Sequence, residues 1–501
     1  MDKINLLYAR NLITRKTAVV QQELSFVVLV ENLSYDKSID VVWAGEDGVW
    51  HTLPASYHSS AERQREYWVA RTVLALAPDR SLPGNVDFAL RYRALGKEYW
   101  DNNHGANHAI QADSGIAPGP GRPVVNSGFE ASLADGETLV PIAVAVDDKL
   151  AATTVSIHWT SDNWKTTQQS PCRFARDYWD ETFLSNARNP NHYGYQIWNG
   201  ALRAGDAFRI EYRIRCETRQ GIVWDDNFGK SYALQRPALK VLILNLHCCQ
   251  EDNQDYKLSQ IAKAIGDLDV DIVCLQEVAE LWNEGRGDWQ TNTARIINER
   301  LGTPYHLVTD WSHLGFGRYR EGVALLSRHP IRKHAARYVS ASHDPYSIHS
   351  RKVVMAQVEV PSVGLLNVFS SHLSWWDDGF PEQFENLRRW AGEEHTSQVT
   401  ATMLGGDFNI KAGSNGYQLV VASNEFDDQF LSARSPQTFH KIFEVRDLPW
   451  SHDLDDDHRI DYVFLRKCSA LRVTSGRVVF TDQDYGTVSD HPGYLMTFVP
   501  K

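Results

Sequence analysis

Cysteine is scarce in this chain, and the few cysteines present have no spacing that would organise a fold. The 501 residues include six cysteines, of which Cys248 and Cys249 are adjacent, and no two have the CxxC spacing of a zinc site. Neither a disulfide framework nor a structural zinc is therefore expected. The start of the chain also lacks a basic segment followed by a long apolar one, and we expect a reducing, cytoplasmic location.

Long apolar runs and an excess of positive charge are also missing. No apolar run approaches the ~20 residues that cross a bilayer, so no membrane contact is expected. The 51 Lys and Arg residues are outnumbered by 63 Asp and Glu residues, which gives a net charge of −12. Proteins that bind nucleic acid normally present a basic surface, so nucleic acid is not an expected partner. Tryptophan, in contrast, is abundant at 16 residues, which suggests surfaces that stack on planar or sugar-like ligands.

Two breaks in the pattern divide the chain into three segments, as its length also suggests. Residues 115–123 read GIAPGPGRP, a composition that predicts a linker without helix or strand, and QRPA at 235–238 is a shorter break. The expected domains are therefore 1–113, 124–234 and 238–501.

The first two segments resemble each other. FALRYRA in one and FRIEYRI in the other alternate apolar and polar residues, as strands with one buried face do. Their aromatic residues also correspond: Trp43, Trp50, Phe88, Tyr92 and Trp100 match, in that order, Trp159, Trp164, Phe208, Tyr212 and Trp224. We predict a tandem duplication of a β-sandwich of about 100 residues.

The third segment alternates strand and helix patterns, which predicts an α/β domain with two sheets packed face to face. Polar residues follow or end nearly every apolar strand pattern in it. They are Asn245, Glu277, His372, Asp407, Asn409, Asp461, Asp490 and His491. Strands deliver side chains to one edge of a sheet, so we expect these residues to meet. Carboxylates for a hard cation, histidines for protons and amides for oxygens predict metal-assisted phosphoester cleavage.

Each of these residues has a structural alternative when it is taken singly. Glu277 could be a surface carboxylate, Asn245 a turn residue and Asp461 the cap of a loop. Their joint occurrence in this order favours the functional interpretation.

The order Asn, Glu, His, Asp-x-Asn, Asp, Asp-His over 238–501 resembles that of the endonuclease/exonuclease/phosphatase superfamily. The resemblance implies a four-layered α/β sandwich with the site at one edge of its two sheets. It also implies Mg²⁺ as the cofactor, with Mn²⁺ as a substitute, held by Glu277, Asn245 and Asp490.

The same resemblance implies roles for the other site residues. Asp407 would orient and deprotonate the attacking water, and Asn409 would donate its amide to a phosphoryl oxygen. His491, held in one tautomer by Asp461, would neutralise charge on the transferred group. His372 would protonate the leaving oxygen or bind a phosphate oxygen.

The N-terminal pair resembles the starch- and glycogen-binding modules of family 21, whose signature reads WDNNxGxNY. Residues 100–108 read WDNNHGANH and depart at the last position, whereas residues 224–232 read WDDNFGKSY, with two asparagines replaced. The resemblance implies immunoglobulin-like β-sandwiches and an α-glucan site in the first copy. Its candidate residues are Trp100, Asn102, Asn103 and Asn107; core packing of Trp100 and Trp224 and Asn-rich turn chemistry are the alternatives.

An aromatic segment directly after His372, SWWDDGF, is expected at the rim of the site. Aromatic faces suit the C–H faces of a sugar, and carboxylates suit its hydroxyls. The predicted substrate wall consists of Trp375, Trp376, Trp311 and Tyr319, with core packing of one of the two adjacent tryptophans as the alternative. The acidic run at 453–457 is expected in a solvated loop.

The combination of a phosphohydrolase-type domain with α-glucan modules implies a substrate class. We expect a Mg²⁺-dependent phosphatase that hydrolyses the phosphate monoester of a malto-oligosaccharide phosphate, with maltose 6′-phosphate as the expected substrate and α-glucan as a second partner. The alternatives are a phosphodiesterase or nuclease, a sphingomyelinase-like hydrolase, or a glucan-binding scaffold. The sequence leaves open whether the modules bind glucan, shape the pocket or form a dimer.

Overall fold

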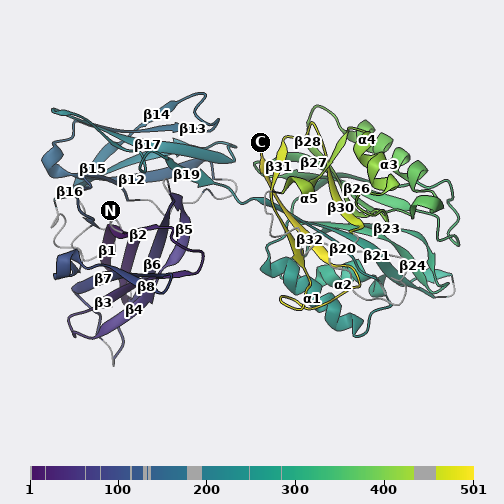
Figure 1. Cartoon of the computed structure of the whole chain (residues 1–501), viewed down its shortest axis with the longest axis horizontal. Helices are drawn as coiled ribbons and strands as arrows, with labels where there is room; N and C mark the ends of the chain where they lie inside the picture. The colour runs from purple at the N-terminus through teal and green to yellow at the C-terminus, as the bar shows by residue number, and fades with distance from the viewer. Residues whose placement is uncertain are drawn as a thin grey trace. The chain divides into compact units, whose positions relative to one another are not determined.

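The structure is a computed structural model of the chain. It describes residues 3–16, 19–61, 64–78, 81–112, 116–127, 133, 137–177, 194–247, 249–283, 285–433 and 459–501. The acidic run at 453–457 lies outside the described residues. The chain divides into two compact units, Met1–Arg236, built from strands, and Pro237–Lys501, which contains strands and helices (Figure 1). Across the described ranges, no helix has both the length and the apolar character needed to cross a membrane.

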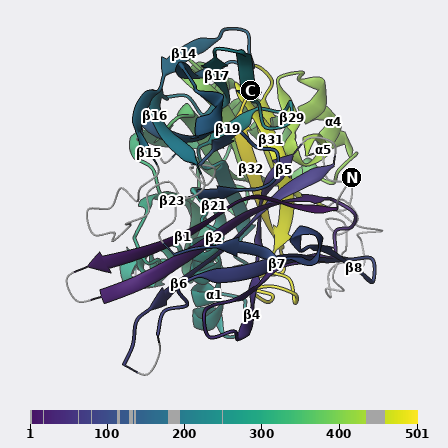
Figure 2. The same cartoon turned by 90° about the vertical axis from the view of Figure 1, so that its left-hand side faces the viewer.

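The first sandwich of the N-terminal unit consists of two sheets. Its elements are β1 (Ile4–Lys16), β2 (Val19–Glu31), β3 (Lys37–Ala44), β4 (Trp50–Pro54), β5 (Ser56–Ala61), β6 (Arg65–Ala75), β7 (Val86–Ala94), β8 (Lys97–Asp101), the 3₁₀ turn η1 (Asn103–Gly105), β9 (His108–Ile110) and β10 (Ile116–Pro118). One sheet has the order β10-β1-β2-β6-β5, and the other has the order β4-β3-β7-β8 with β9 on β7. The long strands β1 and β2 lie side by side (Figure 2).

The second sandwich repeats this arrangement. Its elements are β11 (Val124–Asn126), β12 (Leu139–Asp147), the 3₁₀ turn η2 (Asp148–Leu150), β13 (Thr154–Thr160), β14 (Gln168–Pro171), β15 (Arg173–Asp177), β16 (Tyr195–Arg203), β17 (Arg209–Thr218), β18 (Gly221–Asp225) and β19 (Tyr232–Gln235). The sheet orders are β11-β12-β16-β15 and β14-β13-β17-β18, with β19 on β17. The predicted pair of N-terminal β-sandwiches is confirmed.

The two sandwiches share buried surface through strand β2. Phe26 and Val28 pack in the core of the first sandwich, whereas the alternate residues Val27 and Leu29 pack with the core of the second. A strand buried on both faces reads as a continuous apolar run, which is the pattern of LSFVVLV.

The predicted linker at 115–123 contains a strand, so the expectation that it holds none is wrong. Ile116 pairs with Arg10 at the edge of the first sheet. Proline is tolerated in edge strands because one side makes no ladder hydrogen bonds, which explains Pro118. Gly119 then passes so close to Leu6 that a Cβ would lie 1.9 Å from the Leu6 carbonyl oxygen.

Strand register corrects the match between the two copies. Trp43 is paired with Phe88, and Trp159 is paired with Tyr212. Phe88 therefore corresponds to Tyr212 and not to Phe208. The shift is four residues, an even number that preserves the buried face, so alternation alone cannot detect it.

The C-terminal unit contains two sheets and the helices that cover them. Its elements are β20 (Leu239–Asn245), α1 (Gln254–Asp267), β21 (Ile272–Asn283), β22 (Arg286–Gly287), the 3₁₀ turn η3 (Trp289–Thr291), α2 (Thr293–Glu299), β23 (His306–Gly315), β24 (Tyr319–Ser327), β25 (Ile331–Tyr338), β26 (Lys352–Val360), β27 (Gly364–His372), the 3₁₀ turn η4 (Trp376–Asp378), α3 (Phe380–Glu394), β28 (Val399–Asp407), α4 (Asn415–Ala422), β29 (Phe426–Asp428), α5 (Gln429–Ser432), β30 (Asp461–Arg466), β31 (Leu471–Val479) and β32 (Gly493–Pro500). The seven-stranded sheet has the order β23-β24-β21-β20-β32-β31 with β22 on β21, and the six-stranded sheet has the order β25-β26-β27-β28-β30-β29.

These elements form four layers. Helices α1 and α2 cover the outer face of the seven-stranded sheet, and α3 and α4 cover that of the six-stranded sheet (Figure 1). Along β20, Val241 and Ile243 pack against the other sheet, whereas Leu242 and Leu244 pack beneath α1. This alternation between two apolar environments makes VLIL a fully buried strand, and the predicted four-layered α/β sandwich is confirmed.

Strand direction brings the polar residues to one edge. Strands β20 and β21 are parallel neighbours, as are β27 and β28. Asn245, His372 and Asp407 are the last residues of β20, β27 and β28. Asp461 begins the antiparallel β30 and lies directly opposite Asp407.

Candidate active site

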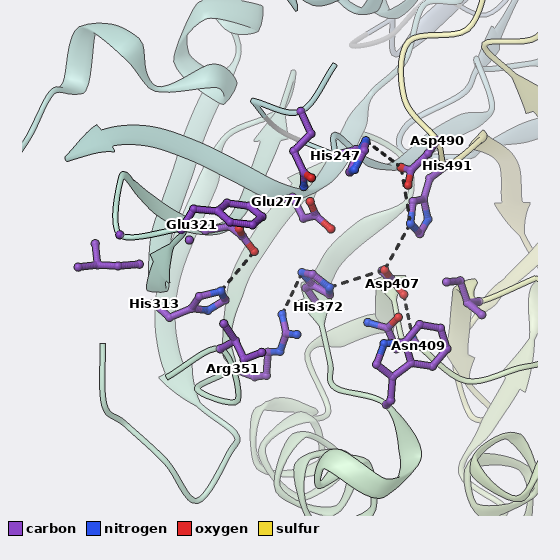
Figure 3. Close-up of a pocket in the computed structure, with 18 of the residues that line it drawn as sticks. His247, Glu277, His313, Glu321, Arg351, His372, Asp407, Asn409, Asp490 and His491 are labelled. Carbon is purple, nitrogen blue, oxygen red and sulfur yellow. Dashed lines mark hydrogen bonds and ion pairs between the residues drawn. The ribbon is translucent and has the colours of Figure 1, made fainter. Parts of the chain in front are cut away.

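A cavity of about 700 Å³ is present where these strands end (Figure 3). The predicted residues that line it are Glu277, His372, Asp407, Asn409, Asp490 and His491. Asn245 and Asp461 lie behind this lining and form hydrogen bonds to it. The structure thus brings all the predicted catalytic and metal-binding residues into one cluster.

Asn245 cross-links two carboxylates of the cavity wall. Its Nδ2 donates to Oε1 of Glu277 at 3.0 Å and to Oδ2 of Asp407 at 3.1 Å. Its Oδ1 accepts from the backbone N–H of His247 at 3.0 Å. Because a backbone N–H can only donate, the atom of Asn245 that faces His247 must be the oxygen Oδ1, and the nitrogen Nδ2 faces the two carboxylates. Asn245 therefore positions the two carboxylates, and its expected role as a metal ligand stays a prediction.

Glu277 reaches the cavity from a β-bulge. The register of β21 against β24 shifts between Leu275 and Val278, and Glu277 has a φ of 49°. Bulges redirect side chains, which is how this strand turns a carboxylate toward the site. Burial, and then the nearby charge of Glu321, raise the pKa of Glu277, and Asp490 adds to the effect. Negative charge is therefore crowded on this wall.

The chemistry of this wall fits a divalent cation. Carboxylates that raise the pKa of a neighbour repel one another, and a bound cation would relieve that repulsion. Mg²⁺ takes one or two carboxylates together with substrate and water oxygens, and Glu277 and Asp490 would hold it. Two groups among the described residues have ligand atoms within 4.8 Å of one another: His247, Glu251 and Asp490, and Asp407, Asp461 and His491.

Asp407 has the properties of a general base. It is buried, and its Oδ1 accepts from the backbone N–H of Asn409 at 2.8 Å. Burial, and then the charge of Asp461, raise the pKa of Asp407 to about 7. A carboxylate with this pKa takes a proton from an attacking water and releases it again near neutral pH.

Asn409 is held at the cavity by its amide. Its Nδ2 donates to the carbonyl oxygen of Leu373 at 2.8 Å. A primary amide carries two N–H hydrogens, and this bond uses one of them. The expected role as a donor to a phosphoryl oxygen is compatible with this placement.

His491 and Asp461 form a buried dyad. Nδ1 of His491 lies 2.8 Å from Oδ2 of Asp461. Burial alone would lower the pKa of His491, but the charges of Asp461, Asp407 and Asp490 outweigh it and raise that pKa well above its usual value. These charges therefore favour the imidazolium form of the ring. Oδ1 of Asp461 is buried and has no hydrogen-bond partner among the described residues, so its bonding is directed to His491.

His372 is in the opposite protonation state. Its Nδ1 lies 3.3 Å from Nη1 of Arg351, and because arginine only donates, Nδ1 accepts and the ring hydrogen is on Nε2. Burial, and then the charge of Arg351, lower the pKa of His372 well below its usual value. A neutral ring can donate a hydrogen bond but does not give up its remaining proton. This direction favours the expected role of binding a phosphate oxygen, and protonation of the leaving oxygen stays the alternative prediction.

Further polar residues that the sequence analysis did not identify line the cavity. They are His247, His313, Glu321 and Arg351. Nε2 of His313 lies 3.4 Å from Oε1 of Glu321. Glu321 and Arg351 come at the start of β24 and just before β26, which run antiparallel to β21 and β27. The beginning of an antiparallel strand reaches the same edge as the end of its neighbour, and this signal was available in the sequence.

The predicted aromatic wall is only partly present. Trp375 lines the cavity, whereas Trp376, Trp311 and Tyr319 lie outside its described lining. Trp311 instead packs against the guanidinium of Arg320, whose carbon lies 4.9 Å from the ring centroid. Tyr319 packs against the core between the seven-stranded sheet and its helices. The substrate contact expected of these three residues stays a prediction that this cavity lining does not support.

In the N-terminal unit, the tryptophans of the two signature segments lie at the surface. Trp100 is 45% exposed and Trp224 is 46% exposed, so the core-packing alternative is wrong for both. Arg91 packs over Trp100 and Arg215 packs over Trp224, at 5.6 and 6.0 Å from the ring centroids. Both tryptophans therefore keep surface that a ligand can contact.

The asparagines of the first copy also have a turn role. Oδ1 of Asn102 accepts from the backbone N–H of Gly105 at 3.0 Å, and Nδ2 of Asn103 donates to the carbonyl of Asn107 at 3.0 Å. The second copy keeps the first bond with Asp226, which accepts from Gly229 at 2.9 Å. Replacement of asparagine by aspartate thus preserves the turn, because both side chains supply the acceptor.

The two units correspond to known families. Residues 242–491 match the Endonuclease/Exonuclease/phosphatase family, a class of hydrolases. Residues 9–111 and 131–235 match the Carbohydrate/starch-binding module (family 21). The C-terminal unit therefore belongs to the Endonuclease/Exonuclease/phosphatase family, and the N-terminal unit carries two family 21 modules.

Individual proteins are similar to parts of the chain. The uncharacterized protein YbhP of Escherichia coli K12 is 26% identical over 253 residues, which is 48% of this chain and 90% of YbhP. Protein phosphatase 1 regulatory subunit 3E of Mus musculus is 38% identical over 84 residues, 16% of this chain and 28% of that protein. An endonuclease/exonuclease/phosphatase family protein from Leptotrichia buccalis has a TM-score of 0.45 at 26% identity, covering 52% of this chain and all of that one.

Proposed function

We propose that the protein is a Mg²⁺-dependent phosphatase that hydrolyses maltose 6′-phosphate, or a closely related malto-oligosaccharide phosphate, to the free sugar and phosphate. This is the activity of bacterial maltose 6′-phosphate phosphatase. One observation carries the proposal: a single cavity combines crowded carboxylates, a carboxylate whose pKa is raised to about 7 and an aromatic face, Trp375. The family 21 modules of the same chain favour an α-glucan-derived sugar.

The first requirement of the reaction is to bring water to a dianionic ester that repels it. A divalent cation held by Glu277 and Asp490 would neutralise charge on the phosphate. Asp407 accepts the proton of the attacking water, and its buried hydrogen bonds fix the direction of attack. As the new oxygen–phosphorus bond forms, the bond to the sugar oxygen breaks. The leaving oxygen takes a proton from solvent water, and Asp407 returns the proton of the attacking water to solvent.

The second requirement is to stabilise charge on the transferred group. The imidazolium of His491 presents Nε2 near the carboxylates of Asp407 and Asp490, at 3.9 and 4.0 Å, and is placed to donate to a phosphoryl oxygen. Neutral His372 donates from Nε2, and Asn409 donates its amide. Donors that are fixed before the reaction stabilise developing charge without reorganising.

The decisive experiment is phosphate release from maltose 6′-phosphate in the presence of Mg²⁺. Wild type is expected to release phosphate, and Asp407→Ala and His491→Ala are expected to lose activity on the order of 10²–10⁴-fold. Glu393→Gln, which alters an exposed carboxylate on α3, is the matched control and should match wild type. No release by wild type rules out this substrate, and variants within tenfold of wild type rule out the assigned site.

The modules are proposed to bind α-glucan through the first copy. Retention on amylose should weaken in Trp100→Ala, because this tryptophan is 45% exposed, while Glu277→Ala should be retained like wild type. Equal retention of Trp100→Ala and wild type would count against a glucan site at this tryptophan. Retention together with full activity loss in Glu277→Ala would show that binding and catalysis are separate.

A further inference from the structure

Several side chains that line the cavity are apolar and open to solvent. Phe316 is 73% exposed, Tyr346 is 75% exposed and Trp375 is 38% exposed, and all three line the cavity. Ile348, also exposed, adds aliphatic surface beside them. We call Phe316, Tyr346, Ile348 and Trp375 the aromatic rim. A volume of about 700 Å³ is that of a pocket for a whole small molecule, so the group attached to the phosphate has room inside.

Phe316 occupies a backbone position that does not favour it. It lies in the turn between β23 and β24, where the N–H of Arg318 donates to the carbonyl of Gly315 at 3.0 Å. Phe316 and Gly317, the two central residues, have φ of 53° and 63°. Turns of this type prefer Asn followed by Gly, and a bulky residue with positive φ is strained. Neither the turn nor burial accounts for a phenylalanine here, whereas contact with a ligand does.

The part of the rim that carries Tyr346 is held in place before any ligand binds. The carbonyl of Pro345 accepts from the backbone N–H of Leu314 at 2.6 Å, which joins this loop to the hairpin of Phe316. Oδ1 of Asp344 accepts from the N–H of Tyr346 at 3.0 Å, and Oγ of Ser350 donates to the Asp344 carbonyl at 2.7 Å. A rim fixed in this way loses little conformational freedom on binding.

We propose that the aromatic rim is the subsite for a second hexose ring, the ring that does not carry the phosphate. The proposal rests on the proposed function and adds to it a preference for disaccharide phosphates over monosaccharide phosphates. With the phosphate at the carboxylate wall, the phosphorylated ring lies beside Trp375, and the next ring meets Phe316 and Tyr346. Flat aromatic faces suit the C–H faces of a pyranose, and the hydroxyl of Tyr346 and the amide of Gln250 supply polar contacts at the same cavity.

The test compares kcat/KM for maltose 6′-phosphate and glucose 6-phosphate in wild type, Phe316→Asn and Tyr346→Ala. Phe316→Asn installs the residue that the turn prefers, so it should keep or raise the Tm while it removes the ring. Each variant should reduce kcat/KM for the disaccharide by about five- to tenfold and leave that for glucose 6-phosphate within about twofold. Leu431→Ala, which removes an exposed apolar side chain on α5, is the matched control and should change neither value.

The possible outcomes distinguish this inference from the proposed function. If wild type is active on both sugar phosphates and the variants keep the wild-type ratio of the two kcat/KM values, the subsite is overturned. The proposed phosphatase activity then still stands. Equal losses on both substrates also overturn it, because the rim would then act on catalysis in general. Wild type that is inactive on both sugars overturns the proposed function and the subsite together. Sedimentation of wild type, but not Phe316→Asn, with phosphatidylcholine vesicles would assign the rim to a lipid surface and overturn the sugar subsite.

Discussion

Asp407 and Asp461 lie directly opposite each other on the neighbouring antiparallel strands β28 and β30, and both are buried. Like charges in such a cross-strand pair are destabilising, and burial increases the effect. The two carboxylates differ in their partners: Asp461 bonds to Nδ1 of His491, whereas Asp407 accepts from the amide of Asn245. Asp461 thus favours the cationic form of His491, whereas the pKa of Asp407 is raised to about 7.

Replacement of Asp461 by Asn should lower the pKa of His491 and slow the reaction. The charge of Asp461 is the main influence that raises the pKa of His491 against burial, and Asn keeps the shape without that charge. We expect kcat to fall on the order of 10³-fold. The ring nitrogens of His491, observed by NMR at pH 8, should change from the imidazolium to the neutral pattern. Asp461→Glu should keep the imidazolium, and unchanged ring signals in Asp461→Asn would contradict the dyad.

Replacement of Asp407 by Asn should make stability less dependent on pH. The pKa of Asp407 is about 7 in the folded protein and about 3.9 in an unfolded chain, so between these values the folded state binds the extra proton. The contribution of this proton is complete below pH ~4 and is lost as the pH rises to about 7. Asn at this position cannot ionise and escapes the loss.

The measurement is the free energy of unfolding from pH 4 to pH 8 in EDTA. As the pH rises, the free energy of unfolding of Asp407→Asn should increase relative to that of wild type. This difference should become constant above about pH 7. Loss of one hydrogen-bond acceptor adds a cost that is the same at every pH, so the slope is the test. A difference that is independent of pH would show that Asp407 has an ordinary pKa. The variant should also lack phosphatase activity.

The sequence predicted the parts of the site that depend on strand ends. Asn245, His372 and Asp407 end buried strands, and the apolar patterns of those strands can be read directly, so their meeting point followed. The protonation states of the site residues could not be predicted from the sequence, because they depend on which side chains pack against one another. Burial, and then the charge of Arg351, lower the pKa of His372, and the sequence does not show that these two side chains are in contact.

Three differences between the sequence analysis and the structure also have physical causes. Trp311 was expected at the rim, but the register of β23 shifts between Trp311 and His313, and a bulge changes which side chains face the cavity. Phe88 was matched with Phe208, which lies four residues before its true counterpart Tyr212. An even offset keeps the same face of the strand buried, so a period-two pattern cannot reveal it. The strand at Ile116 was missed because its Pro/Gly-rich surroundings predict a linker, while an edge position tolerates them.

Removal of divalent cations should abolish activity and lower thermal stability. Binding at Glu277 and Asp490 stabilises the folded state by mass action, and a cation at 100 times its Kd contributes about 2.7 kcal/mol. Addition of Mg²⁺ to EDTA-treated protein should restore activity and raise the Tm by about 5 °C. Glu277→Gln should show a much smaller rise, and Glu393→Gln should respond like wild type. An equal rise in Glu277→Gln would exclude this carboxylate as a ligand.

Replacement of Arg351 by Met should raise the pKa of His372. The guanidinium donates to Nδ1 of His372 and to Oγ of Ser374, so it fixes the ring orientation as well as lowering its pKa. Without it, the pKa of His372 should rise, and the acid limb of the pH profile of kcat should move to higher pH, because a protonated ring replaces the neutral one at the cavity. At the pH optimum we expect kcat to fall about 10- to 100-fold.

Arg351→Lys separates the charge from the geometry. Lysine keeps the positive charge that lowers the pKa of His372 but lacks the planar fork that bonds His372 and Ser374 together. This variant should keep the acid limb near its wild-type position and still lose kcat, because the ring is no longer held. If Arg351→Met and Arg351→Lys show the same pH profile as wild type, His372 does not depend on Arg351 for its protonation state. If only Arg351→Met moves the limb, the charge sets the protonation state and the fork sets the orientation.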